Sequence, residues 1–248
     1  MTEAHNFAYE AIDNQFADES ASTRRKFVGG AAATLGGMGL LGPLGGTAAS
    51  AISLKKNTPE KILNVATTAE VLATIVNTVG FERLSFDAVT TKNIEAAAYE
   101  ELIHYKVLRS LGGRPVSKKL WVPDAALASS TSFLQTIVQG DQIFISAYLL
   151  ATTVFGQLGE GKLARFTAEF MGAEAVHRAL AKQSLGQLGN DRAFMRAQFD
   201  TINDAVRNLE HNGFGFGKKG NAPGSFFDFD EVSKRTPKPA AVNTLKPN

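Results

Sequence analysis

Two short motifs, each with a glutamate followed three residues later by a histidine, carry the residue types best suited to chemistry in this chain. The first motif pairs Glu101 with His104, and the second pairs Glu174 with His177. Residues three apart on an α-helix lie on the same face, so each carboxylate points in the same direction as its imidazole. Because the chain has only four histidines, two of them in equivalent positions predict a shared metal site between helices.

The composition restricts the ligands that such a site can use. The chain of 248 residues has no cysteine, which excludes thiolate metal sites and disulfides. Carboxylate and imidazole ligands suit iron, manganese or zinc better than copper(I) or iron–sulfur clusters. The 26 basic and 24 acidic residues are well mixed, which argues against a nucleic-acid partner. The sequence also lacks glycine-rich phosphate loops and a serine nucleophile elbow.

Long segments of helical periodicity position the two motifs. The spacing of apolar residues predicts four helices, over residues 59–79, 90–111, 130–155 and 162–185. Thr58 and Pro59 are typical of a helix start, because a hydroxyl caps the helix and proline fits its first turn. The two motifs fall on the second and fourth helices, Glu70 lies in the apolar stripe of the first, and Asp141 lies in that of the third.

The connections between these helices predict an all-α fold made of two hairpins and one long crossover. The first and third connections are short enough for antiparallel neighbours, whereas residues 112–128 contain two prolines and no periodicity. Extended to roughly 55 Å, this segment can run the length of a helix of roughly 33 Å. The second and third helices can therefore be parallel.

The remainder of the chain is expected to pack around this helical domain of residues 59–211. A fifth helix over residues 191–209 has no Glu/His motif and is predicted to lie outside the bundle. Residues 212–248 are rich in glycine, proline and phenylalanine. We expect an irregular tail whose aromatic side chains hold it to the surface or serve an interface in a homo-oligomer.

With these features the chain resembles the ferritin-like superfamily, and within it the domain that bacterial ferritin-like proteins share with plant desiccation-related proteins. The likeness covers residues 59–185 and is carried by the segments 62–70, 99–112, 147–149 and 174–177. It implies a four-helix bundle in which each hairpin contributes a glutamate from its first helix and a Glu/His motif from its second.

Carried over residue by residue, the resemblance implies metal ligands at Glu70, Glu101, His104, Glu174 and His177. The sixth ligand should be a glutamate on the third helix, but none occurs between residues 125 and 159. Asp141 stands closest to the expected place and is one methylene shorter. Gln139 and Gln142 flank it, but a neutral amide is a poor ligand for a hard cation. We therefore expect one tight metal position and one weak or empty position, with Tyr148 as a candidate neighbour.

Two functions of different classes are compatible with this pattern. The resemblance implies a di-metal carboxylate oxidoreductase that uses iron or manganese to oxidise iron or to handle dioxygen or peroxide. The alternative is a non-catalytic envelope or stress protein, related to desiccation, that keeps the bundle around a degenerate metal site.

The first 51 residues have the features of an export signal. Arg24, Arg25 and Phe27 precede an uncharged, glycine-rich run, an arrangement that resembles a twin-arginine signal. Residues 49–51 form one plausible cleavage site and residues 47–49 another, and residues 52–58 would then be a linker. We expect the mature protein in the periplasm or outside the cell, after passage through the twin-arginine export machinery. The alternative is an uncleaved membrane anchor, which the glycine content of the run disfavours.

Overall fold

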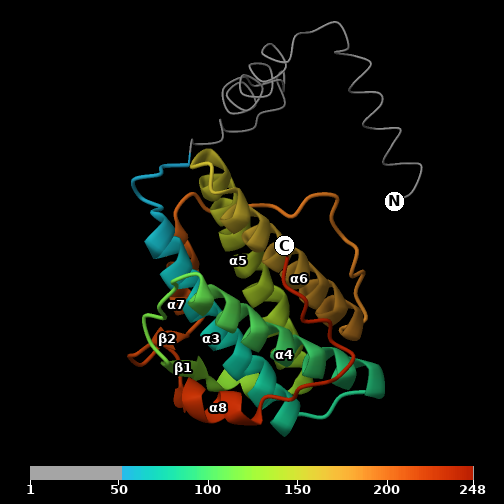
Figure 1. Cartoon of the computed structure of the whole chain (residues 1–248). Coiled ribbons are helices and arrows are strands. Elements are labelled where there is room, and N and C mark those ends of the chain that lie inside the picture. Colours follow the sequence, from blue (N-terminus) through green and yellow to red (C-terminus); the bar gives the residue numbers. More distant parts are fainter. Residues whose placement is uncertain (1–51, 248) are drawn as a thin grey trace, which may run out of the picture. The chain divides into compact units, whose positions relative to one another are not determined.

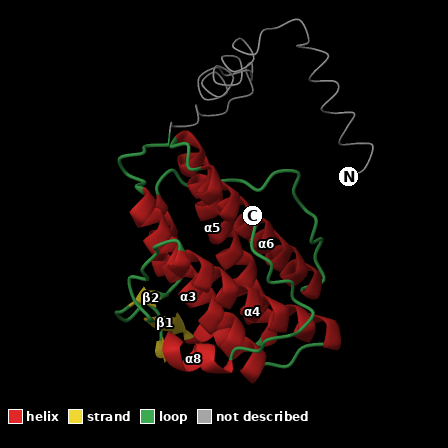
Figure 2. Ribbon diagram, in the orientation of Figure 1, coloured by secondary structure: helices red, strands yellow, loops and turns green. Residues whose placement is uncertain are grey.

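The computed structural model describes residues 52–247, so the predicted signal segment lies outside the described residues. Four long helices dominate this part of the chain: α3 (Pro59–Arg83), α4 (Ala88–Ser110), α5 (Ser130–Gln157) and α6 (Gly161–Ser184). Short connections make α3 and α4 one antiparallel pair and α5 and α6 another (Figures 1 and 2). The pairs pack through α3 against α5 and α4 against α6, so all four helices share one core.

The helix starts are fixed by local side-chain caps. The Thr58 hydroxyl accepts from the backbone N–H of Lys61 and the Asp87 carboxylate accepts from that of Thr90, while Ser129 forms a capping box with Ser132. The predicted start at Thr58 and Pro59 is therefore confirmed. The first connection is shorter than predicted, because α3 continues to Arg83 and leaves only residues 84–87 before α4.

Helix α3 is the central helix of the described residues. Its length and hydropathy would suffice for a membrane span, but 89% of its most apolar window is buried inside the fold, as expected for a core helix. Buried threonines do not interrupt it, because the hydroxyls of Thr67 and Thr74 donate to the carbonyls of Leu63 and Glu70, one turn earlier. The helix therefore brings Glu70 into the core with its own backbone satisfied.

The connection between α4 and α5 runs from one end of the helices to the other. The Ser130 hydroxyl, at the start of α5, donates to the carbonyl of Ser85, between the end of α3 and the start of α4. Helices α4 and α5 therefore begin at the same end of the molecule, and residues 111–129 span the distance between the ends.

A small sheet, which the prediction of an all-α fold with an irregular tail missed, joins this connection to the C-terminal region. Strand β1 (Lys119–Pro123) lies between β2 (Gly215–Phe216) and β3 (Gly224–Asp228), and both pairings are antiparallel. The 3-10 helix η1 (Asp124–Leu127) follows β1, and α8 (Phe229–Arg235) follows β3. Two aromatic pairs, Trp121 with Phe226 and Tyr105 with Phe229, fix the C-terminal region in place.

The predicted fifth helix is shorter than expected. Helix α7 spans Ile202–His211, and the preceding residues from 191 are not helical. The Arg178 guanidinium on α6 binds Asp191 with one nitrogen–oxygen distance of 2.9 Å, and Phe194 is 84% exposed. The segment is thus held by an ion pair at its start, by hydrogen bonds of α5 to the Arg196 carbonyl and by the packing of Phe199 on the core, rather than by a continuous helical apolar face.

Candidate metal centre

The structure brings all six predicted ligand residues into one buried region enclosed by the four long helices. Helix α3 provides Glu70, α4 provides Glu101 and His104, α5 provides Asp141, and α6 provides Glu174 and His177. None of these residues is more than 8% exposed. Their ligand atoms form two groups that could each hold an ion, Glu70/Glu101/His104/Glu174 and Asp141/Glu174/His177. Within each group, one ligand atom per residue lies within 4.8 Å of the others.

Glu101 and Glu174 each face both histidines. For Glu101, Oε2 lies 3.5 Å from Nδ1 of His104, and Oε1 lies 3.2 Å from Nδ1 of His177. For Glu174, the corresponding distances are 3.7 Å from Oε1 to His104 and 3.4 Å from Oε2 to His177. Each carboxylate therefore presents one oxygen to each side of the cluster, as a carboxylate that bridges two ions does.

Glu70 has its two oxygens divided between two neighbours. Its Oε1 accepts a hydrogen bond from the Tyr148 hydroxyl, whereas its Oε2 lies 3.6 Å from Nδ1 of His104. The ring of Phe170 lies against both His104 and Tyr148, with centroid distances of 4.5 and 5.4 Å. Tyr148, expected as a neighbour of the site, thus orients Glu70, while Phe170 closes this side with apolar surface.

Glu100 is a contact of the cluster that the sequence analysis missed. Its Oε2 lies 2.6 Å from Nε2 of His177, across the interface between α4 and α6. A histidine that donates one ring N–H to a carboxylate has its other nitrogen oriented and made more basic for a ligand role. Glu100 directly precedes Glu101, but only the packing of α6 on α4 determines which histidine it meets.

The electrostatics of the cluster follow from burying four carboxylates together. Burial, with repulsion from Glu101, raises the pKa of Glu70 well above its usual range, and burial with the charge of Glu174 does the same to the pKa of Asp141. Burial alone would lower the pKa of His104 and His177, but the surrounding carboxylates raise both well above the ordinary value.

The pKa of Glu101 is shifted in the direction opposite to those of Glu70 and Asp141. Burial disfavours its charged form, but its contacts with His104 and His177 outweigh that cost and hold its pKa well below the usual range. Glu101 therefore stays ionised beside the two histidines. Protons and cations would compete for the same oxygen and nitrogen atoms of this cluster.

A surface cavity of about 140 Å³ reaches the cluster at His104, whose side chain is 11% exposed. Its walls include Glu100 on α4, Glu169 on α6 and the C-terminal residues 242–247. The C-terminal segment crosses this side of α4 and α6 in Figure 1. The cavity thus connects the cluster to solvent past two carboxylates.

Comparisons of the chain with protein-family models, with curated proteins and with solved structures found no match. The helical fold and the buried Glu/His cluster, which could hold metal, are therefore the basis for inferring what the protein does.

Proposed function

We propose that the chain is an exported ferritin-like protein that holds two divalent ions, iron or manganese, in the buried Glu/His cluster. One observation carries the proposal. Among the described residues, nine buried side-chain atoms have no hydrogen-bond partner, and every one except Nε of Arg178 belongs to the six candidate ligands. A buried polar atom without a partner costs free energy, about 1–3 kcal/mol each, so a cluster of them is best explained by a ligand that satisfies them.

The donor set suits two divalent ions. Glu70, Glu101, Asp141 and Glu174 supply four carboxylates, whose charge two divalent cations balance when both imidazoles are neutral. Oxygen and imidazole ligands from four helices of one bundle are the arrangement of carboxylate-bridged metal pairs. Glu70 and His104 would hold one ion and Asp141 and His177 the other, and Glu101 and Glu174 lie beside both histidines and could serve either ion.

Bound iron or manganese would supply exchange of electrons with dioxygen or peroxide. The protein's own residues orient the ligands and limit the access of water. Tyr148 fixes Glu70, Glu100 fixes His177, and Phe170 covers His104. The widest opening toward the cluster among the described residues is the cavity beside His104, and smaller pockets reach His177 and Asp141. These features favour oxidation of iron or handling of dioxygen or peroxide.

The metal content of the purified protein tests this function. We expect about one equivalent of iron or manganese in protein purified without added metal, and two binding events when the metal-free protein is titrated under nitrogen. At a free ion concentration of 100 times Kd, binding should stabilise the fold by about 2.7 kcal/mol, measured as a rise in Tm.

No bound ion under either condition would favour the alternative, a non-catalytic envelope or stress protein that keeps a degenerate site. One observation supports that alternative: Asp141 replaces the longer glutamate on α5, so the second group has three residues where the first has four.

Export through the twin-arginine machinery is the second part of the proposal. A cluster buried between four helices is most easily filled while the protein folds, and twin-arginine signals serve proteins that fold before export. Replacing Arg24 and Arg25 with lysines should therefore retain the precursor in the cytoplasm, which cell fractionation would show. Normal export of this double variant would mean that the signal belongs to another class. If the parent protein remains uncleaved in the membrane fraction, the uncleaved membrane anchor is favoured instead.

Glu100 gives a test of the role of the outer carboxylate. Replacing Glu100 with alanine should weaken the ion held by His177 by about 10–100-fold, the usual effect of removing such a partner. Glu100→Gln should lose less, because its amide oxygen can still accept from Nε2 of His177. Titration calorimetry of parent and both variants measures this, and equal affinities in all three would mean that Glu100 does not orient the ligand.

A further inference from the structure

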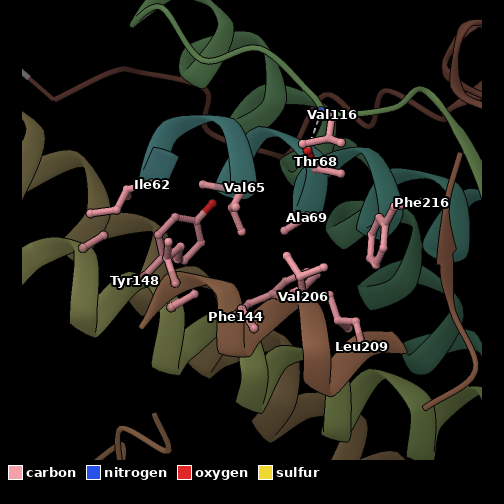
Figure 3. Close-up of a pocket in the computed structure, with 15 residues that line it drawn as sticks. Ile62, Val65, Thr68, Ala69, Val116, Phe144, Tyr148, Val206, Leu209 and Phe216 are labelled. Carbon is pink, nitrogen blue, oxygen red and sulfur yellow. Dashed lines mark hydrogen bonds between the residues drawn. The ribbon is translucent and has the colours of Figure 1, made fainter. Parts of the chain in front are cut away.

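A second cavity, of about 60 Å³, lies behind Tyr148 and is separate from the opening beside His104. Side chains from α3, α5, α7 and β2 converge on it (Figure 3). The apolar side chains of Ile62, Ala69, Phe144, Val206 and Phe216 are part of its wall. The Tyr148 ring lines the same space, while its hydroxyl bonds Glu70 of the metal cluster. A single side chain therefore separates the cavity from a candidate metal ligand.

The wall offers no free polar atom to a water molecule. Its two hydroxyl groups belong to Thr68 and Tyr148. The Thr68 hydroxyl donates to the carbonyl of Asn64 at 2.7 Å and accepts from the backbone N–H of Val116 at 2.9 Å. The Tyr148 hydroxyl donates to Glu70. The cavity opens to the surface beside Val116, which is 71% exposed. A bound water needs about two to four polar partners, so this apolar wall favours a small apolar molecule over water.

The size of the cavity selects the ligand. Dry apolar cavities of about 150 Å³ accept benzene or xenon, and this cavity has less than half of that volume. This space fits a diatomic gas or one xenon atom, and its apolar wall offers no hydrogen bonds to a sugar or a nucleotide. We propose that it is a binding site for dioxygen, placed one side chain from the metal cluster. The choice of dioxygen among small apolar molecules rests on the proposed function, whereas the existence of the gas site does not.

Xenon is the probe that tests the site without metal. Crystals of the mature protein under xenon pressure should show one xenon atom between Ala69, Phe144 and Val206. Val206→Phe should fill the space from α7 and abolish xenon binding. Val89→Phe makes the same change on α4 at a residue that is 68% exposed, and it should retain xenon. Ala69→Leu, which fills the cavity from α3, provides a second variant if Val206→Phe does not fold.

The two proposals fail in different ways. The gas site is overturned if the parent binds no xenon. It is also overturned if a folded Val206→Phe or Ala69→Leu variant binds as much xenon as the parent. Both outcomes hold whatever the metal content. Xenon in the parent without any metal leaves the gas site and removes the proposed function. In metal-loaded protein, a filled cavity should raise the dioxygen concentration for half-maximal oxidation of ferrous iron, with the number of bound ions unchanged. An unchanged oxygen dependence would overturn the assignment of dioxygen.

Discussion

Replacing Glu101 with alanine should abolish metal binding at both positions of the cluster. Its Oε1 and Oε2 face different histidines, at 3.2 Å from His177 and 3.5 Å from His104, so one substitution removes a ligand from each ion. It also removes a carboxylate whose pKa is held well below its usual range by the two histidines. We expect affinity at each position to fall by more than about 100-fold, which is the upper end of the effect of losing an outer partner.

Titration calorimetry with manganese and metal analysis after dialysis would measure this loss. Glu95→Ala is the matched control, since Glu95 is a half-buried glutamate of the same helix that lies outside the cluster. Far-ultraviolet circular dichroism must show that both variants stay helical. If Glu101→Ala lost only one ion, Glu101 would be a terminal ligand and Glu174 alone would bridge.

The helices and ligand residues could be predicted from the sequence because both follow from local periodicity. A glutamate and a histidine three residues apart share a face in any helix, so α4 and α6 each bring their pair into the core. Glu70 and Asp141 follow from the apolar stripes that contain them. All six residues lie in the cluster because each helix buries the face that its apolar residues define.

The sheet could not be predicted because it depends on pairing between distant segments. Strand β2 has only two residues, Gly215 and Phe216, and no period can be read from them. Strand β1 lies in the crossover, where Trp121 pairs with Phe226 across the sheet. The tail is ordered by such contacts, with Phe214 and Phe229 buried in the core, rather than by any helical or alternating pattern of its own.

The contact of Glu100 with His177 could not be predicted for a related reason. Helical spacing places Glu100 beside the face that carries Glu101 and His104, but it does not specify the neighbouring helix. The contact forms because α6 packs against α4. The predicted helix from residue 191 failed differently, since Asp191 binds Arg178 and Lys182 of α6 and the chain remains irregular until Ile202.

The two positions of the cluster are unequal because of Asp141. Its carboxylate joins the group with Glu174 and His177, and its Oδ2 is buried without a hydrogen-bond partner. On the opposite side, the Tyr148 hydroxyl fixes Oε1 of Glu70, while Oε2 of Glu70 also lacks a hydrogen-bond partner and lies 3.6 Å from His104. No corresponding hydrogen bond holds Oδ2 of Asp141 in the described structure, so its position costs more entropy to fix when an ion binds.

Titration of the parent should therefore give one tight ion and one weak ion per chain, and changes at Asp141 should affect only the weak one. Asp141→Glu adds the methylene that a glutamate would supply on α5 and should tighten the weak position by about tenfold or more, equivalent to about 1.4 kcal/mol. Asp141→Ala should leave one ion, because Glu70, Glu101, His104 and Glu174 remain. Anaerobic titrations with manganese, read as stoichiometry and two affinities, distinguish these cases. Two equally tight ions in the parent would mean that Asp141 already reaches as far as a glutamate. A loss of both ions in Asp141→Ala would mean that Asp141 is a ligand of both ions.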